Sequence, residues 1–292
     1  MDLFDPAFLK KLEYLHILSK RAFAGQFKGE RRTRVKGTGI EFADHRGYTP
    51  GDDFRHIDWG AYQRLGRLLL RMFEEEQDLP IYLLVDQSQS MAHGSPSKLE
   101  YAKQVAAALC YIGLANLDKV TVVGYSNQVD AELRSKRGKS QIFNVFRFLT
   151  DRQPSGETDA REAFKRFGAS GRQRGTAVVL SDFLNAGGFE EPLNALRYHE
   201  HDLFCVHIVA PSDADPALKG DLRLVDSETH GTHDISITPG MLEAYRRTFD
   251  TFCDELSRYC TRYQFGYFRT RTDTAFEDVI LQAFRQGRFL AD

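Results

Sequence analysis

The stretch IYLLVDQSQSM, residues 81–91, decides the fold class expected for this chain of 292 residues. A short apolar run ends at Asp86, and Ser88 and Ser90 follow at alternate positions. An apolar run of this length, followed by polar turn residues, predicts a buried β-strand. In an open parallel sheet, ligands bind beyond the carboxyl ends of the strands. The stretch therefore predicts a core strand with a candidate site at its end.

Strand-like and helical segments alternate after this stretch. Strands are expected at 119–126, 131–136, 175–183 and 201–209, and helices at 98–117, 140–152, 159–170 and 190–199. The tail predicts a hairpin at 221–237, a helix at 240–260, then a strand and a last helix. Strands that alternate with helices of this length predict a mostly parallel sheet with helices on both faces.

The first 78 residues differ in composition from the rest. Apolar residues at helical spacing predict a helix at 6–23. Residues 37–60 are rich in Gly, Asp and aromatic residues, which favours short strands and turns. We therefore expect a small β-rich N-terminal domain at 1–78 and an α/β domain at 79–292.

Charged residues of both signs crowd the stretch DHRGYTPGDDFRHID, residues 44–58. One interpretation is a second metal site or an acid–base cluster. The alternation of charge signs favours a turn with a partly buried network of ion pairs to Arg46, Arg55 and Arg64. Trp59, the only tryptophan, is expected to anchor this segment to the core.

Composition excludes several classes of function. The net charge of -2 gives no global attraction to nucleic acid or anionic lipid, so no nucleic-acid partner is expected. No run of about 18 apolar residues and no signal-peptide core are present, so we expect no membrane span. Four cysteines without a CxxC pair fit a reducing compartment, so a cytoplasmic location is expected. No P-loop is present, so the chain is not itself an ATPase of that class.

A basic stretch occupies residues 20–36, which contain seven Lys or Arg residues and one Glu. One interpretation is a solvated surface. The other is a docking surface for an acidic partner, formed by Lys28, Arg31, Arg32, Arg34 and Lys36.

Asp182 ends the apolar strand expected at 175–183 and should lie on the same rim as Asp86. Two carboxylates with the hydroxyls of Ser88 and Ser90 form an oxygen-only set, which a hard divalent cation prefers. Mg²⁺ is the first expectation, with Mn²⁺ or Ca²⁺ as alternatives. The competing interpretation is that these residues cap the helices that follow the strands.

The DxSxS spacing, with an aspartate closing a later strand, resembles the metal-ion-dependent adhesion site of von Willebrand factor A domains. That site also uses a threonine from a loop, and the match here is Thr158 in SGETDARE. Thr158 is equally suited to capping the helix expected from residue 159. Thr176 is near it in sequence but falls inside a strand.

Residues 37–76, GTGIEFADHRGYTPGDDFRHIDWGAYQRLGRLLLRMFEEE, resemble the signature of the bacterial DUF58 family. The resemblance implies a Rossmann-like von Willebrand A domain with a small β-rich N-terminal subdomain. Members are often encoded beside MoxR-type AAA+ ATPases, which implies such an ATPase as partner. Many members have membrane helices before this segment, and this chain is expected to be a form without them.

The resemblance implies a protein-interaction module rather than an enzyme. A bound Mg²⁺ would use an exposed Asp or Glu of a partner to complete its shell, and its ligands here would be Asp86, Ser88, Ser90, Thr158 and Asp182. The alternative is a metal-dependent phosphohydrolase or nuclease on an α/β sheet. Such an enzyme would need more carboxylates near the metal than DQSQSM and SDFLNAGG supply.

Overall fold

The computed structural model describes residues 3–26, 36–37, 41–74, 80–134, 137–156, 159–185, 187–225 and 231–285. The chain divides into a larger unit, residues 1–22 and 79–290, and a smaller one, residues 23–78 and 291–292. We expected the first helix in the N-terminal domain. Most of α1 (Pro6–Gln26) instead belongs to the larger unit, because Phe8 on its buried face packs against Phe146 and Phe276.

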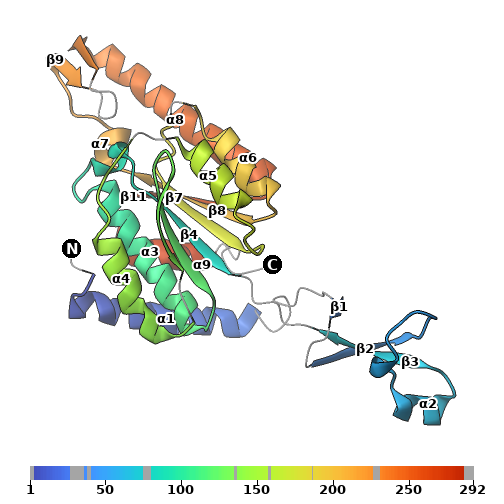
Figure 1. Ribbon diagram of the computed structural model, residues 1–292. Coiled ribbons are helices and arrows are strands. Elements are labelled where there is room, and N and C mark those ends of the chain that lie inside the picture. The colour runs from blue at the N-terminus through green and yellow to red at the C-terminus, as the bar shows by residue number, and fades with distance from the viewer. Residues whose placement is uncertain are drawn as a thin grey trace. The chain divides into compact units, whose positions relative to one another are not determined.

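A six-stranded sheet with the order β11-β8-β7-β4-β5-β6 forms the centre of the larger unit (Figure 1). All neighbours are parallel except β5 and β6, which are antiparallel. The strand order places β6 at one edge of the sheet. The strands are β4 (Ile81–Asp86), β5 (Val120–Tyr125), β6 (Val129–Arg134), β7 (Thr176–Ser181), β8 (Asp202–Val209) and β11 (Gly266–Arg271). The predicted mostly parallel α/β sheet is confirmed.

Helices cover both faces of this sheet (Figure 1). One face carries α1, α3 (Lys98–Ala115), α4 (Ile142–Thr150) and α9 (Phe276–Arg285). The other carries α5 (Ala160–Ala169), α6 (Glu190–Tyr198) and α8 (Pro239–Arg262). Short helical turns are η2 (Gln89–Ala92), η3 (Lys139–Gln141) and α7 (Pro211–Ala214). No helix in the described ranges is long and apolar enough to cross a membrane.

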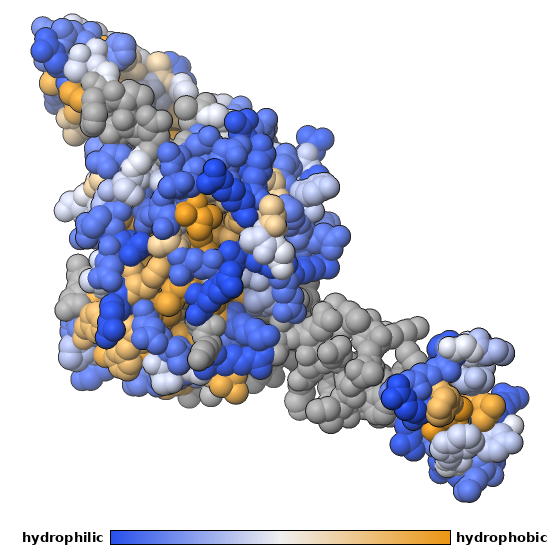
Figure 2. Space-filling model, viewed as in Figure 1, coloured by the Kyte–Doolittle hydropathy of each residue, from blue (hydrophilic) through white to orange (hydrophobic). Residues whose placement is uncertain are grey.

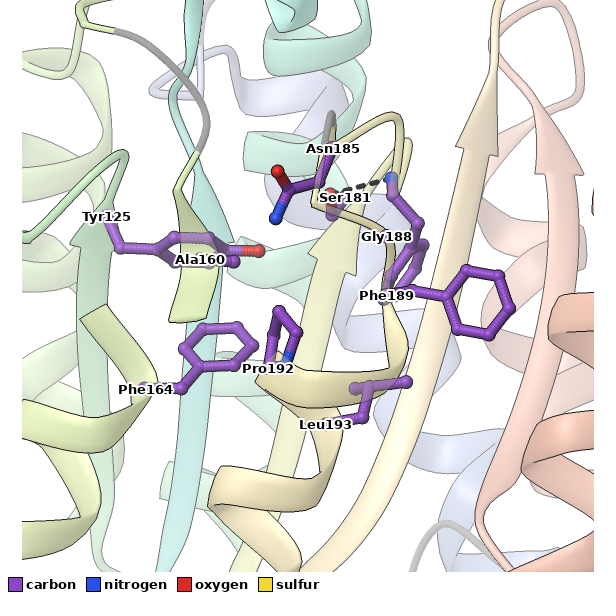
Figure 3. Close-up of a pocket in the computed structure, with 10 residues that line it drawn as sticks. Tyr125, Ala160, Phe164, Ser181, Asn185, Gly188, Phe189, Pro192 and Leu193 are labelled. Atoms are coloured by element: carbon purple, nitrogen blue, oxygen red, sulfur yellow. Dashed lines mark hydrogen bonds between the residues drawn. The ribbon is translucent and has the colours of Figure 1, made fainter. Parts of the chain in front are cut away.

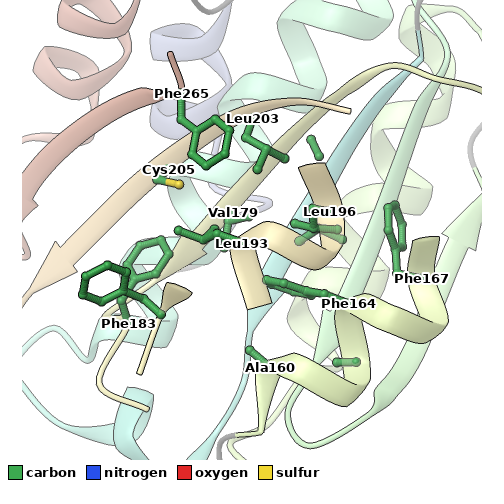
Figure 4. Packing of buried hydrophobic residues seen from close by; sticks show 14 of the residues in the cluster. Ala160, Phe164, Phe167, Val179, Phe183, Leu193, Leu196, Leu203, Cys205 and Phe265 are labelled. Atoms are coloured by element: carbon green, nitrogen blue, oxygen red, sulfur yellow. The ribbon is translucent and has the colours of Figure 1, made fainter. Parts of the chain in front are cut away.

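The central strand β4 is buried at every residue. A strand covered by helices on both faces requires apolar side chains in both directions, which explains the continuous run in its sequence. On the face of α5 and α6, Phe164 and Phe167 pack with Leu193, Leu196 and Cys205 (Figure 4). This packing holds both helices against the sheet.

The predicted hairpin is confirmed as β9 (Gly220–Val225) and β10 (Thr232–Ile237), an antiparallel pair that forms a sheet of its own. The contacts of this hairpin assign it to the larger unit. A two-stranded hairpin is only marginally stable in isolation. Its strands carry mostly exposed side chains, so they add little to the main core.

The smaller unit contains a three-stranded antiparallel sheet of order β1-β3-β2. Its elements are β1 (Lys36–Gly37), β2 (Glu41–Gly47), η1 (Phe54–His56), α2 (Trp59–Leu65) and β3 (Leu69–Glu74). Asp58 caps α2, since its Oδ1 accepts the Ala61 N–H at 2.9 Å. Its Oδ2 lies 2.9 Å from His45 Nε2 and 3.1 Å from Arg71 Nε. Two of the expected ion pairs form, Arg46 with Asp52 and Arg55 with Asp53, whereas Arg64 pairs with no carboxylate among the described residues and binds the Gly60 carbonyl.

Hydrogen bonds from Arg71, the Ala61 N–H and His45 hold the pKa of Asp58 well below its usual range. The prediction that Trp59 anchors this segment to a core is wrong, because its side chain is 59% exposed. The buried position of α2 belongs to Ala61 instead. A small side chain at the packed position leaves the indole on the outer side of the helix.

Candidate functional site

Two aspartates lie at the same end of two adjacent strands. Asp86 is the last residue of β4, and Asp182 directly follows β7, which pairs with β4 in parallel. Both side chains are buried. The carboxyl ends of parallel strands are the usual position for a ligand in an open α/β sheet.

Hydrogen bonds occupy both oxygens of the Asp86 carboxylate. Oδ1 accepts the Ser88 N–H at 2.9 Å, and Oδ2 accepts the Ser181 hydroxyl at 2.6 Å. The Ser181 hydroxyl in turn accepts the Phe183 N–H at 2.9 Å. Ser181 therefore fixes the orientation of Asp86. Sequence analysis missed this residue, although a hydroxyl at the end of an apolar strand, next to Asp182, was a usable signal.

The two serines of the DxSxS stretch lie in the loop that leads into η2. Ser88 is buried and Ser90 is half-buried. Their hydroxyl oxygens are 3.1 Å apart. The alternate spacing in the sequence thus brings two neutral oxygen donors together beside Asp86.

The loop before α5 runs beside this stretch. The Ser155 N–H donates to the Gln87 carbonyl at 2.7 Å, and the Gln89 N–H donates to the Gly156 carbonyl at 3.2 Å. Thr158, the expected threonine ligand, follows this loop and lies outside the described residues. Thr176 is the first residue of β7, at the opposite end from Asp182, about 20 Å away at the usual rise of a strand.

The basic docking surface expected from the sequence falls mostly outside the described residues. Lys28, Arg31, Arg32 and Arg34 lie there, and for Lys36 only the backbone, in β1, is described. The structure therefore leaves that expectation as a prediction.

A buried lysine, which sequence analysis missed, contacts the second aspartate. Lys98 Nζ lies 2.7 Å from Asp182 Oδ2 and 2.9 Å from Asp213 Oδ2, and its side chain is 2% exposed. Burial lowers the pKa of Lys98, but the two carboxylates outweigh burial and raise the pKa above its ordinary value. Lys98 is therefore a charged ammonium. Lys98 is the first residue of α3, and nothing in the neighbouring sequence predicts that its side chain is buried.

Carboxylates outnumber cationic side chains among the described groups that contact one another at this end of the sheet. The carboxylates of Asp86, Asp182 and Asp213, if ionised, outnumber the single Lys98 ammonium by two charges. Burial and then the charge of Asp182 raise the pKa of Asp86 to about 7. A buried carboxylate with such a pKa requires a proton or a cation to compensate its charge.

The oxygen donors fit a hard divalent cation. Each carboxylate oxygen has two lone pairs, so the hydrogen bonds that Asp86 and Asp182 accept leave further acceptor capacity on both carboxylates. Carboxylates and hydroxyls suit Mg²⁺. Within the described ranges, no group of three or more His, Cys, Asp or Glu side chains is placed to hold a metal by itself. A cation would therefore depend on Ser88 and Ser90.

A small apolar cavity adjoins the site between β7, α5 and α6 (Figure 3). Phe164, Phe189 and Leu193 line it, with Tyr125 and Ser181 on the side of the sheet. The hydroxyl of Ser181 also binds Asp86, so the cavity and the site share one residue. Burial, followed by the charge of Asp86, raises the pKa of Tyr125 well above its ordinary value, so its hydroxyl stays protonated.

Helix α3 positions Lys98 through a capping box. The Ser97 hydroxyl accepts the Glu100 N–H at 3.2 Å, and the Ser97 N–H donates to Glu100 Oε2 at 3.3 Å. We expect Ser97→Ala to lower the free energy of unfolding by about 1 kcal/mol. Urea unfolding measures this change. Ser140→Ala, at an exposed position, is the matched control and should change stability by less than about 0.5 kcal/mol. Equal losses in the two variants would contradict the role of the cap.

Comparison with known proteins identifies relatives of this chain. The family described as "Protein of unknown function DUF58" matches residues 44–255. The uncharacterized protein Rv1480 of Mycobacterium tuberculosis is 26% identical over 251 residues, which cover 84% of this chain and 79% of that protein. The uncharacterized protein MAV169 of Mycobacterium avium is 33% identical over 105 residues, or 36% of this chain and 62% of that protein.

Among solved structures, the conserved hypothetical protein BatB of Bacteroides thetaiotaomicron superposes with a TM-score of 0.42 at 16% identity. The superposition covers 71% of this chain and 98% of BatB. An aerotolerance-related membrane protein of Bacteroides fragilis gives the same TM-score and identity, with 71% of this chain and 99% of that protein covered. Scores of this size do not assign a fold family.

Proposed function

This chain belongs to the DUF58 family, and from that premise we propose that it is a metal-dependent protein-interaction module with a von Willebrand A-like domain. Asp86, Ser88, Ser90 and Asp182 would hold a Mg²⁺ ion, with Thr158 as a further ligand. When bound, the ion supplies positive charge and an open position for a carboxylate from a partner. The resemblance to the family makes a MoxR-type AAA+ ATPase the proposed partner.

The observation that carries this proposal is the pair of buried carboxylates, Asp86 and Asp182, at the ends of β4 and β7. Asp86 is fully buried, yet the only described ammonium that contacts these carboxylates is that of Lys98, which binds Asp182 and Asp213. The two serine hydroxyls add oxygen donors without adding charge. A divalent cation held by such a set keeps a surplus of positive charge, which favours one more carboxylate from outside.

Each side chain has a separate task in this arrangement. Ser181 orients Asp86 through the hydrogen bond of 2.6 Å. Lys98 orients Asp182 by binding Oδ2, while the Leu184 N–H binds Oδ1 at 3.0 Å. Residues positioned in this way lose little freedom when a ligand binds, which favours affinity.

The enzymatic alternative has less support from the described residues. A phosphohydrolase needs a general base or a cation that reaches the substrate. Lys98 is buried and bound to two carboxylates. His207, which is level with Ser181 on β8, is also buried, and its Nδ1 lies 2.9 Å from the Tyr267 hydroxyl. Burial lowers the pKa of His207 to about 4, so it is neutral and enclosed.

The double variant Ser88→Ala/Ser90→Ala tests the proposal directly. We expect it to weaken Mg²⁺ binding, measured by isothermal titration calorimetry, by at least about tenfold, which corresponds to about 1.4 kcal/mol. The reason is the loss of both neutral donors. Ser140→Ala should bind Mg²⁺ as the wild type does. Unchanged Mg²⁺ affinity in the double variant would exclude the serines as ligands.

Partner binding is tested with the same variants. The wild type and the Ser88→Ala/Ser90→Ala variant serve as bait in pull-downs from the native lysate, once in Mg²⁺ and once in EDTA. The proteins that each bait retains are identified by mass spectrometry. We expect an AAA+ ATPase retained only by the wild type in Mg²⁺. The same ATPase retained under every condition would place the interface away from the metal. Mg²⁺-dependent hydrolysis of p-nitrophenyl phosphate that Asp86→Asn abolishes would instead support the enzymatic alternative.

A further inference from the structure

Gln87 places a buried amide between Asp86 and Ser88, two of the proposed metal ligands. Hydrophilic side chains cover much of the visible face of the larger unit (Figure 2), but Gln87 is only 3% exposed. Burying an amide costs free energy unless hydrogen bonds satisfy it. The hydrogen bonds of Gln87 therefore indicate why a polar residue occupies this position.

Gln87 connects the end of β4 to the turn between β5 and β6. Its N–H donates to the Tyr125 carbonyl at 2.9 Å, and its side-chain Nε2 donates to Asp130 Oδ2 at 2.7 Å. The Ser126 hydroxyl donates to the same carboxylate oxygen at 2.8 Å. Hydrogen bonds to carboxylates are stronger than those between neutral groups. Gln87, Ser126 and Asp130 are called the Gln87 network below.

Two glycines give this network its room. A Cβ atom on Gly124 would lie 2.9 Å from Gln87 Oε1, so the amide packs directly on the backbone of β5. Gly156 has a φ of +74°, and a Cβ atom there would lie 3.0 Å from Ser126 Oγ. A larger residue at either position would press on a member of the network. The network thus brings the loop before α5 and the turn after β5 against the end of β4.

The loop before α5 binds the backbone on both sides of Ser88. The Gln87 carbonyl accepts the Ser155 N–H at 2.7 Å, and the Gln89 N–H donates to the Gly156 carbonyl at 3.2 Å. These two hydrogen bonds fix the path of the chain that carries the Ser88 hydroxyl. The same segment of chain continues directly into Ser90, whose hydroxyl oxygen lies 3.1 Å from that of Ser88.

We propose that Gln87 is a positioning residue, which through its network holds Ser88 and Ser90 in the arrangement that binds Mg²⁺. The inference rests on the proposed function and adds a residue that determines the affinity of that site. Residues that only orient metal ligands typically change metal affinity by roughly 10–100-fold when they are replaced. The competing interpretation is that the network only stabilises the turn between β5 and β6. That interpretation predicts a change in stability without a change in Mg²⁺ affinity.

Gln87→Glu tests the inference by the sign of its effect. The variant places a carboxylate against Asp130 where the wild type has a donor, so the hydrogen bond cannot form. The added negative charge beside Asp86 would strengthen cation binding if charge alone mattered. We expect isothermal titration calorimetry to show the opposite, Mg²⁺ binding weaker by about tenfold or more.

Three further variants separate position from charge and from folding. Gln128→Glu adds the same charge at an exposed position of the turn and should not weaken Mg²⁺ binding. Gln87→Glu/Asp130→Asn exchanges donor and acceptor at the net charge of the wild type, and should restore most of the affinity. Gln87→Met removes the hydrogen bond without adding charge. It should weaken Mg²⁺ binding as well, and it replaces Gln87→Glu if that variant does not fold.

Hydrogen exchange of the full chain in EDTA reports on the loop without metal. The Ser155 and Gln89 amides should exchange faster in Gln87→Glu than in the wild type, and Gln87→Glu/Asp130→Asn should regain protection. Unchanged exchange, unchanged or stronger Mg²⁺ binding in Gln87→Glu, or no recovery in the double variant would each overturn this inference and leave the proposed function intact. A wild type that binds no Mg²⁺ would overturn the proposed function, and this inference with it.

Discussion

Replacing Lys98 with methionine should lower the free energy of unfolding by about 3–5 kcal/mol. The ammonium lies 2.7 Å from Asp182 and 2.9 Å from Asp213, and its side chain is 2% exposed. Methionine keeps most of the length of the side chain but removes its charge. Two carboxylates would then remain in a region with little water and no counterion. Urea unfolding at neutral pH in EDTA measures the loss.

A control and a rescue separate this effect from a simple packing change. Lys165→Met removes an exposed lysine that pairs with Glu162, and should change stability by less than about 1 kcal/mol. Lys98→Met/Asp182→Asn should recover part of the loss, because the unpaired charge is removed as well. Added Mg²⁺ should also stabilise Lys98→Met, since a cation would supply the missing charge. A loss below about 1 kcal/mol for Lys98→Met would show that water reaches these carboxylates.

In EDTA, the contribution of Asp86 to stability should decrease as the pH rises from about 4 to about 7. Burial and the charge of Asp182 raise the pKa of Asp86 from 3.8 to about 7 in the folded chain. Between these values the folded state binds more protons than the unfolded state, so raising the pH favours unfolding. A shift of this size corresponds to at most about 4 kcal/mol, lost once the pH exceeds 7.

The difference between wild type and Asp86→Asn isolates this contribution, because other groups titrate in the same range. His207 acts in the opposite sense, since burial lowers its pKa to about 4 and its contribution grows as the pH rises above that value. Urea unfolding of both proteins is measured at pH 5 and pH 8. The wild type should lose more stability than Asp86→Asn, and Mg²⁺ at pH 8 should restore it. Equal losses would contradict a buried, uncompensated Asp86.

Local sequence pattern predicted most of the secondary structure and the positions of Asp86 and Asp182 in the sheet. The strand that ends at Asp86, the strand that precedes Asp182 and the helices between them agree with the structure, because hydrophobic periodicity is a local property. The placement of both aspartates at one end of the sheet also followed from the pattern. Parallel neighbours joined by helices necessarily end on the same side.

The burial of Lys98 and the exposure of Trp59 could not be predicted from local sequence pattern. Lys98 is buried because α3, Asp182 and Asp213 meet around it, and Asp213 comes from α7, far along the chain. Trp59 is exposed because Ala61, and not the indole, occupies the packed side of α2.

The sequence by itself therefore determined most elements of the fold and placed Asp86, Ser88, Ser90 and Asp182 at the ends of their strands, because neighbouring residues specify both. The tertiary structure alone decided their electrostatics: the hydrogen bond from Ser181, the ammonium of Lys98 and the raised pKa of Asp86. The physical reason is that desolvation and Coulomb interactions depend on distances between segments remote in the chain, which no local pattern contains.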